Sequence, residues 1–368
     1  MEKIKKILVT GAKGFIGKNL VIKLKEQGYN VFEYDKGQNM AVLDKYCKSA
    51  DFVFHLAGVN RPQDNKEYME GNYGFTGKLL ELLKKNNNKS PVMVSSSIQA
   101  EYDTPYGKSK KAGEELIIDY NKQTGHRVLI YRFPNVFGKW SSPNYNTVVA
   151  TFCQNISRDL PIQINDSEAI VKLIYIDDLI KTIIDDMENT TGKIYHEASP
   201  IFSIKLVELA NLIYSFKDSR ETKKLCDMKD DFTKKLYATY LSFLPIDKFG
   251  YELKMNSDIR GSFTEFIKDN GQVSVNISKP GIVKGNHYHH TKNEKFLVVS
   301  GKGVIRFRHI LSNEVIEYFV SSDKLEVVDI PIGYTHNIEN IGNIDMVTIM
   351  WASEEFDPNN PDTYFLEV

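Results

Sequence analysis

The order of apolar and polar positions divides the chain into two parts. Up to about residue 245, short apolar runs rich in β-branched and aromatic residues alternate with segments of helical periodicity. The runs cover residues 7–10, 31–34, 52–56, 92–95 and 128–133, and the helical segments cover residues 15–27, 66–86 and 106–122. Strands that alternate with helices predict an α/β domain with a doubly wound parallel sheet, covered on both faces.

From about residue 250 the pattern becomes one of short strands. Residues 272–278 alternate strictly between polar and apolar, and apolar runs follow at 296–299, 304–307, 314–320, 325–330 and 346–351. Short strands separated by glycine-containing turns predict an all-β sandwich or barrel. We therefore expect an α/β domain over residues 1–247 and an all-β domain over residues 248–368. The charge-rich residues 219–235 are expected to form a solvated helix or hinge.

Composition excludes several classes of protein. Lys and Arg total 47 and Asp and Glu total 48 among 368 residues, so there is no basic footprint for nucleic acid or an anionic membrane. No apolar stretch approaches the ~20 residues of a membrane span, and a glycine loop follows the first residues too closely for a signal peptide. The three cysteines are far apart and odd in number, which favours a reducing cytoplasm over a disulfide framework.

Gly11, Gly14 and Gly17 follow the first apolar run and open the first helical segment. Such a loop brings backbone N–H groups close to a pyrophosphate at a helix N-terminus. Asp35 ends the second run, where a carboxylate can hold an adenosine ribose and thereby favours NAD. Lys13 and Lys36 could offset the repulsion between Asp35 and a 2′-phosphate, so the residues alone leave NAD and NADP open.

Tyr106 and Lys110 are four residues apart and share one face of a predicted helix. An ammonium group near a phenol is expected to lower the phenol pKa from about 10. Such a tyrosine can exchange a proton with a carbonyl or alcohol oxygen at neutral pH. Residues 95–97 are three serines at the end of the preceding strand, and they could hydrogen-bond the same oxygen.

In order and spacing, these motifs resemble the Rossmann-type extended short-chain dehydrogenase/reductases that act on nucleotide sugars, over about residues 1–245. The matching segments are the glycine loop, residues 55–58, Asn72, the serines, the Tyr-x-x-x-Lys pair and residues 132–138. The resemblance implies that Tyr106 is the catalytic acid/base, that Lys110 activates it, and that Ser97 rather than Ser96 polarises the carbonyl. It places Asn135 and Arg61 near the substrate. The implied cofactor-binding residues are Gly11, Lys13, Gly14, Phe15, Ile16, Gly17, Asp35, Lys36, Leu56, Ala57, Tyr106 and Lys110.

A second constellation lies in the all-β part. His287 and His289 are two apart, hence on one face of a strand, and Glu294 and His336 follow. Three imidazoles and one carboxylate on inward-facing strands suit zinc or another divalent transition metal. The spacings resemble the two cupin motifs, a double-stranded β-helix or jelly-roll, except that Leu325 stands where the second motif usually opens with glycine. His290 and His309 are expected to be solvent-facing or structural.

Residues 258–265 and 280–288 also resemble the cupin 3,5-epimerases of 4-keto-6-deoxy nucleotide sugars. That resemblance implies that His287 is the base that removes a proton beside the ketone. The implied nucleotide-binding residues are Arg260, Phe263 and Glu265. His289 and Lys284 depart from that family's glutamine and arginine, and His289 completes the metal motif. His287 is therefore left open as ligand or base, and if it is a ligand, Tyr334 or Lys295 is expected to move the proton.

The whole chain resembles bifunctional capsular polysaccharide enzymes in which a nucleotide-sugar reductase is fused to a cupin. This implies C3 epimerisation of UDP-2-acetamido-2,6-dideoxy-4-hexulose in the cupin, followed by NADPH-dependent C4 reduction to UDP-2-acetamido-2,6-dideoxy-L-talose. It further implies NADPH rather than NADH, zinc, a homodimer and a UDP-linked 4-keto-6-deoxy amino sugar as the partner. The alternative is a single-step 4-keto-sugar reductase whose cupin is a metal-stabilised dimerisation module. A non-catalytic nucleotide-sensing protein is a third hypothesis, which the Tyr106, Lys110 and Ser97 set opposes.

Overall fold

The computed structural model describes residues 5–145, 147–189, 192–249, 251–269, 271–290, 292–331, 333–359 and 361–368. The chain divides into two compact units, the first of residues 1–214 and 229–245 and the second of residues 215–228 and 246–368. Residues 215–228, which the sequence analysis placed with the first domain, thus belong to the second unit. Within the described residues, no helix is both long and apolar enough to cross a membrane.

Six parallel strands form the central sheet of the first unit, in the order β2-β1-β3-β4-β5-β8. Their bounds are β1 Lys6–Thr10, β2 Asn30–Tyr34, β3 Phe52–His55, β4 Val92–Ser97, β5 Val128–Phe133 and β8 Tyr195–His196. Along β1, Ile7 and Val9 pack in one core, while Leu8 between them packs in the other. Burial on both faces explains why these strands are continuous apolar runs.

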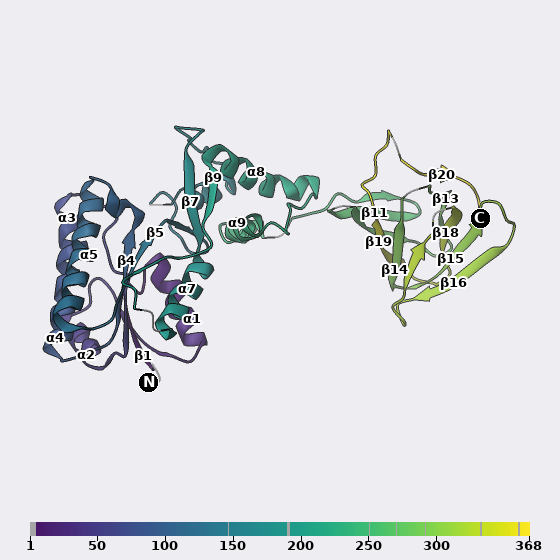
Figure 1. Cartoon of the computed structure of the whole chain (residues 1–368). Coiled ribbons are helices and arrows are strands. Elements are labelled where there is room, and N and C mark those ends of the chain that lie inside the picture. The colour runs from purple at the N-terminus through teal and green to yellow at the C-terminus, as the bar shows by residue number, and fades with distance from the viewer. Residues whose placement is uncertain are drawn as a thin grey trace. The chain divides into compact units, whose positions relative to one another are not determined.

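Helices cover both faces of this sheet and confirm the doubly wound prediction (Figure 1). On one face lie α1 (Phe15–Glu26) and α7 (Ile176–Glu188). On the other face lie α2 (Met40–Ser49), α4 (Phe75–Lys85) and α5 (Pro105–Thr124). Short α3 (Lys66–Tyr68) and a π-helical turn, Met69–Gly74, precede α4, and a 3₁₀ turn, Ile98–Glu101, links β4 to α5.

The rest of the first unit adds a small sheet in the order β6-β7-β9. The remaining elements are β6 (Asn135–Phe137), α6 (Val148–Ile156), β7 (Ile170–Tyr175), β9 (Phe202–Lys205), α8 (Leu206–Thr222), which ends in the second unit, and α9 (Asp231–Leu241). Leu236 and Tyr240 are buried, and Arg158 Nη1 donates to the Phe243 carbonyl at 2.8 Å. These contacts show that residues 236–244 pack within the first unit.

The second unit consists of two antiparallel sheets, in the orders β10-β11-β12-β19-β14-β17 and β16-β15-β18-β13-β20. The strands are β10 Asn256–Asp258, β11 Gly261–Lys268, β12 Gln272–Ser278, β13 Val283–Tyr288, β14 Glu294–Ser300, β15 Lys302–His309, β16 Val315–Ser321, β17 Val327–Ile330, β18 Tyr334–Asn340, β19 Met346–Ala352 and β20 Tyr364–Phe365. A 3₁₀ turn, Ile246–Lys248, precedes them. Phe296, Ile305 and Ile338 belong to the apolar core between the sheets, and the arrangement confirms the predicted jelly-roll class.

Main-chain hydrogen bonds explain why residues 215–228 belong to the second unit. Leu225 N donates to the Lys268 carbonyl at 3.0 Å, and Lys268 N donates to the Lys223 carbonyl at 2.8 Å. The segment after α8 therefore extends the edge of β11. The charge-rich residues 219–235 form the end of α8, this strand-like link and the start of α9.

Candidate functional site

The glycine loop follows β1, which lies between β2 and β3 in the central sheet. The chain therefore continues to one side of β1 with β2 and to the other side with β3, so the strand order reverses at this point. Ligands of open α/β sheets bind beyond the carboxyl ends of the strands at this point. Gly11 has φ +71°, and a Cβ atom there would lie 2.7 Å from the Ala57 nitrogen. A Cβ atom on Gly17 would lie 2.1 Å from the Gly11 oxygen. Glycine at these positions lets the loop bring N–H groups to the start of α1.

Asp35 is bound to the backbone of this loop. One carboxylate oxygen accepts from Lys13 N at 2.6 Å and the other accepts from Lys36 N at 2.7 Å. Lys13 and Lys36 are themselves exposed. Asp35 thus fixes the loop through its carboxylate, and the two residues that donate to it carry cationic side chains.

A cavity of about 880 Å³ at the start of α1 holds most of the residues predicted for the reductase. The predicted residues on its wall are Phe15, Ile16, Leu56, Arg61, Ser96, Ser97, Tyr106, Lys110 and Asn135. Tyr106 and Lys110 lie one helical turn apart on α5, with the Lys110 Nζ atom 5.8 Å from the centre of the Tyr106 ring. The structure therefore brings the tyrosine, the lysine and the serine to one cavity.

The pKa of Tyr106 does not fall below its ordinary value of about 10, contrary to expectation. Burial raises the pKa of the phenol to about 12, and a hydrogen bond with Ser97 opposes this only in part. Lys110 Nζ donates to the Ser95 carbonyl at 3.0 Å, and burial lowers the pKa of this lysine to about 8. Tyr106 therefore keeps its proton at neutral pH, which is the form that can donate to a carbonyl oxygen being reduced.

The serines at the end of β4 have different partners. Ser96 donates its hydroxyl hydrogen to the carboxylate of Glu114, which is buried. Ser97 Oγ accepts from Gln99 N at 3.2 Å and is hydrogen-bonded to Tyr106. The hydroxyl of Ser97 is thus beside the tyrosine, whereas that of Ser96 is engaged in a structural contact.

Two buried polar side chains behind the cavity were not assigned a role by sequence reasoning. Asn72 accepts from Val59 N at 2.9 Å and donates to the Val59 carbonyl at 3.0 Å and to Ser109 Oγ at 2.9 Å. His55 lies between the hydroxyl groups of two threonines, at 2.7 and 2.9 Å, and burial lowers its pKa to about 3. Both residues lie in the matching motifs, but their partners come from other elements, so spacing alone could not define their roles.

The four predicted metal ligands of the second unit come together. Ligand atoms of His287, His289, Glu294 and His336 all lie within 4.8 Å of one another. Glu294 Oε2 lies 3.2 Å from His289 Nε2 and 3.3 Å from His336 Nε2. These three atoms are buried and have no hydrogen-bond partner among the described residues. Partnerless buried polar atoms are rare in folded proteins, and such a set fits a divalent cation.

The ionisation of the cluster also suits a cation. Burial would raise the pKa of Glu294, but the neighbouring imidazoles of His289 and His336 hold it well below its usual range. Burial, followed by the nearby His336, lowers the pKa of His287 to about 4. The carboxylate is therefore charged and the His287 imidazole neutral at pH 7, the states in which these groups bind metals.

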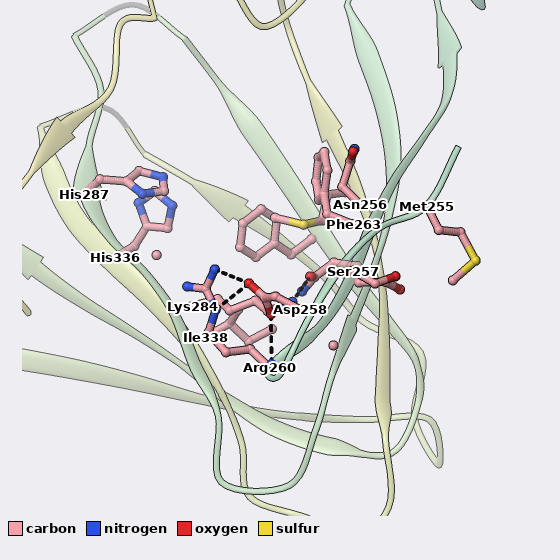
Figure 2. Close-up of a pocket in the computed structure, with 16 residues that line it drawn as sticks. Met255, Asn256, Ser257, Asp258, Arg260, Phe263, Lys284, His287, His336 and Ile338 are labelled. Atoms are coloured by element: carbon pink, nitrogen blue, oxygen red, sulfur yellow. Dashed lines mark hydrogen bonds and ion pairs between the residues drawn. The ribbon is translucent and has the colours of Figure 1, made fainter. Parts of the chain in front are cut away.

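Two members of the cluster lie on the wall of a second cavity, of about 660 Å³ (Figure 2). His287 and His336 line one part of it, and Asp258, Arg260 and Lys284 gather in another. Arg260 Nη2 lies 2.6 Å from Asp258 Oδ2. Lys284 Nζ donates to Asn276 Oδ1 at 2.8 Å and to the Ile277 carbonyl at 2.9 Å. A ligand in this cavity would thus meet both the metal cluster and cationic groups.

Two expectations about this cavity are not met. Arg260 and Phe263 line it, but Glu265 does not and instead pairs with Lys268 at 3.2 Å. The suggested proton carriers Tyr334 and Lys295 are also absent from its described wall. The Lys295 side chain is exposed and pairs with an aspartate, because odd and even positions of β14 face opposite sides.

Two family models match the chain. The NAD dependent epimerase/dehydratase family matches residues 7–196, and the Polysaccharide biosynthesis C-terminal domain matches residues 256–364. The chain is 45% identical over 367 residues to the UDP-2-acetamido-2,6-beta-L-arabino-hexul-4-ose reductase of Pseudomonas aeruginosa, covering 99% of both. It is 29% identical over 217 residues to a putative UDP-glucose 4-epimerase of Methanocaldococcus jannaschii, covering 48% of this chain and 71% of that protein.

Among solved structures, the chain is similar to the capsular polysaccharide assembling protein CapF of Staphylococcus aureus. The TM-score is 0.92 at 54% sequence identity, and the match covers 98% of this chain and 100% of the other. The similarity thus spans both units, whereas the archaeal relative matches about half of this chain.

Proposed function

The chain belongs to the NAD dependent epimerase/dehydratase family, and from this premise we propose that it makes UDP-2-acetamido-2,6-dideoxy-L-talose in two steps. The second unit epimerises C3 of UDP-2-acetamido-2,6-dideoxy-4-hexulose, and the first unit then reduces the C4 ketone with NADPH. The product is a precursor of N-acetyl-L-fucosamine for capsular polysaccharide. Two relatives carry names that fit this chemistry, a hexul-4-ose reductase and a capsular polysaccharide assembling protein.

The observation that carries the reductase step is the meeting of Ser97, Tyr106 and Lys110 on one cavity at the glycine loop. A bound nicotinamide cofactor would supply the hydride for C4. The protonated Tyr106 then donates its proton to the C4 oxygen, and Ser97 hydrogen-bonds the same oxygen as negative charge develops there. The ammonium of Lys110 stabilises the tyrosinate that remains.

We assign NADPH on the geometry of the glycine loop. The carboxylate of Asp35 is engaged by the backbone N–H groups of Lys13 and Lys36, and both lysines are exposed. Two ammonium groups attract a 2′-phosphate, and the N–H groups reduce the repulsion from the carboxylate. Replacing Lys36 with Glu should lower kcat/KM for NADPH more than tenfold relative to NADH, measured by cofactor oxidation; an unchanged ratio would contradict the assignment.

The cluster of His287, His289, Glu294 and His336 fits zinc, with three nitrogen donors and one carboxylate. Bound there, zinc would act as a Lewis acid that polarises a substrate carbonyl and so makes the adjacent C–H acidic. Because His287 then serves as a ligand, another group must remove the C3 proton, and inversion further requires a proton delivered to the opposite face of that carbon. We assign the removal to Lys284, a half-buried ionisable side chain on the cavity wall whose pKa is lowered by burial. Lys284→Met should therefore abolish C3 proton exchange but leave the metal bound.

The two steps must occur in this order. Epimerisation at C3 needs the C4 ketone to stabilise the carbanion, and reduction removes that ketone. If the equilibrium constant of the epimerisation is near one, the reduction displaces this equilibrium by removing the epimerised ketone.

Proton exchange in heavy water tests the proposal. The chain is incubated with the UDP-4-keto-6-deoxy sugar in D₂O without NADPH, and C3 is followed by NMR. Deuterium at C3 supports epimerisation in the second unit. No exchange, with a chain that reduces the ketone once NADPH is added, would leave a single-step reductase with the second unit as a metal-stabilised module. The position of the metal cluster on a ligand-sized cavity favours exchange.

A further inference from the structure

Residues 361–367 lie against β13, which carries His287 of the metal cluster and ends just before His289. Within this segment, β20 pairs with β13, and Phe365 stands opposite His287. Leu366 N donates to the Asn286 carbonyl at 3.0 Å, and its own carbonyl accepts from the Thr335 hydroxyl, beside His336. The segment is thus bonded to β13 and β18 next to the histidines.

One contact of this segment fixes the proton of a metal ligand. His289 Nδ1 lies 2.6 Å from the backbone carbonyl of Asp362. A carbonyl oxygen only accepts hydrogen bonds, so Nδ1 carries the hydrogen and Nε2 keeps its lone pair. Nε2 is the atom that lies 3.2 Å from the Glu294 carboxylate. The carbonyl therefore sets both the tautomer and the ring orientation that a cation at the cluster requires.

A buried lysine holds this carbonyl in place. Lys292 is only 6% exposed, and its Nζ atom donates to the Pro361 carbonyl at 2.7 Å and to Thr363 Oγ1 at 2.9 Å. The Asp362 carboxylate accepts from His290 N at 3.1 Å and from Lys292 N at 2.8 Å. Burying an ammonium group is unfavourable unless its hydrogen bonds are satisfied. Here those bonds flank Asp362 on both sides and fix its backbone.

We propose that Lys292 and Asp362 are positioning residues of the metal centre, which act by holding the Asp362 carbonyl against His289. The inference rests on the metal site proposed above and adds the support that lies outside its four ligands. Loss of such support lowers metal affinity by about 10–100-fold.

The test uses the full chain, stripped of metal and titrated with zinc against a chromophoric chelator of known affinity. Lys292→Met and Asp362→Ala should each raise the zinc Kd by about 10–100-fold. Lys295→Met is the matched control, because Lys295 directly follows the ligand Glu294 in β14 but its side chain is half exposed. Its zinc Kd should equal that of the unchanged chain. If Lys292→Met does not fold, Asp362→Ala carries the test, since it removes only a carboxylate.

A second readout separates positioning from general stability. The visible absorption bands of bound cobalt depend on ligand geometry, so they should shift in both variants at saturating cobalt. Weaker zinc binding together with shifted bands supports the inference. Zinc affinity and bands like those of the control would overturn it, as would weaker binding with unchanged bands, which indicates a purely structural role. If the unchanged chain binds neither metal, the proposed metal site itself fails.

Discussion

The burial of the Lys110 ammonium group in the site lowers the stability of the first unit. Burial lowers the pKa of its ammonium group from 10.5 to about 8, while Nζ keeps a hydrogen bond to the Ser95 carbonyl. A shift of this size corresponds to at most about 3 kcal/mol of unfavourable burial at neutral pH. In the proposed reduction, this ammonium group stabilises the tyrosinate that forms at Tyr106.

Lys110→Met should therefore stabilise the first unit while lowering the reduction rate at least about 100-fold. Removing the buried charge gains about 3 kcal/mol and losing the bond to Ser95 forfeits about 1 kcal/mol, so we expect a net gain of about 2 kcal/mol at pH 7. The gain is complete below pH 8 and fades as the pH rises towards 10.5, because the folded chain loses this proton before the unfolded chain does.

Urea denaturation at pH 7 and pH 9.5 measures this change in stability. The unfolding transition of the first unit is identified as the one that shifts when NADPH is bound. Lys108→Met is the control, since Lys108 is an exposed residue of α5 paired with Asp103. Its stability should change by less than about 0.5 kcal/mol at either pH. A destabilised Lys110→Met chain at pH 7 would contradict the argument.

Glu114, by contrast, is a buried charged residue that stabilises the first unit. Burial would raise the pKa of this carboxyl group, but hydrogen bonds from Arg132 and Ser96 hold it below its usual value. The Arg132 Nη2 atom lies 2.7 Å from Glu114 Oε2, and the Tyr195 hydroxyl donates to the same oxygen at 3.0 Å. One buried carboxylate thus joins β4, α5, β5 and β8.

Glu114→Gln should destabilise the first unit by about 2–3 kcal/mol. This is below the ~3–5 kcal/mol of a fully buried broken pair, because Arg132 is 28% exposed and keeps its partner Glu101. Glu115→Gln, at the exposed neighbouring position, should change stability by less than about 0.5 kcal/mol. Equal denaturation midpoints for the two variants would show that the network carries no stability.

At the scale of elements, two helical glycines differ in what surrounds them. Gly17 is in α1, where an added Cβ atom would lie 2.1 Å from the Gly11 oxygen. Gly77 is in α4, where the nearest atom to an added Cβ is Leu116 Cδ1 at 3.8 Å. Gly17→Ala should displace the loop and abolish NADPH binding. Gly77→Ala should leave binding intact and raise stability by up to about 1 kcal/mol through helix propensity. Calorimetric titration measures NADPH binding by the two variants. Tight binding by Gly17→Ala would refute the close packing of the loop.

Periodicity predicted β12 as a strand, because residues 272–278 alternate between polar and apolar. It did not predict the buried face, since the polar positions of β12 are buried and the apolar positions are half-buried. β13 and β18 could not be predicted in this way, because their residues, which include His287, His336 and Asn337, do not alternate between polar and apolar. Motif spacing found the histidines, but the partners that orient them could not be predicted from spacing. Asp362 is 73 residues from His289, and nothing local links them.

At the scale of the whole molecule, the residues assigned to each proposed step lie within one unit. The described wall of the reductase cavity lies between residues 15 and 206, all in the first unit. The described wall of the metal-cluster cavity lies between residues 255 and 350, all in the second unit. Neither set borrows a side chain from the other unit, so the two activities should be separable by substitution.

Mixing two inactive variants tests this separation. Tyr106→Phe should lose reduction by at least about 1,000-fold yet still exchange the C3 proton, and His336→Asn should lose metal binding and C3 exchange yet still bind NADPH. Because each keeps one intact cavity, an equimolar mixture should form the talose product through an intermediate that leaves one chain and enters another. Product is measured by NMR, with each variant alone as the control. If Tyr106→Phe also loses C3 exchange with its fold and metal intact, the division of labour between the units is wrong. If both variants behave as expected but the mixture stays inactive, the intermediate does not leave the chain that forms it.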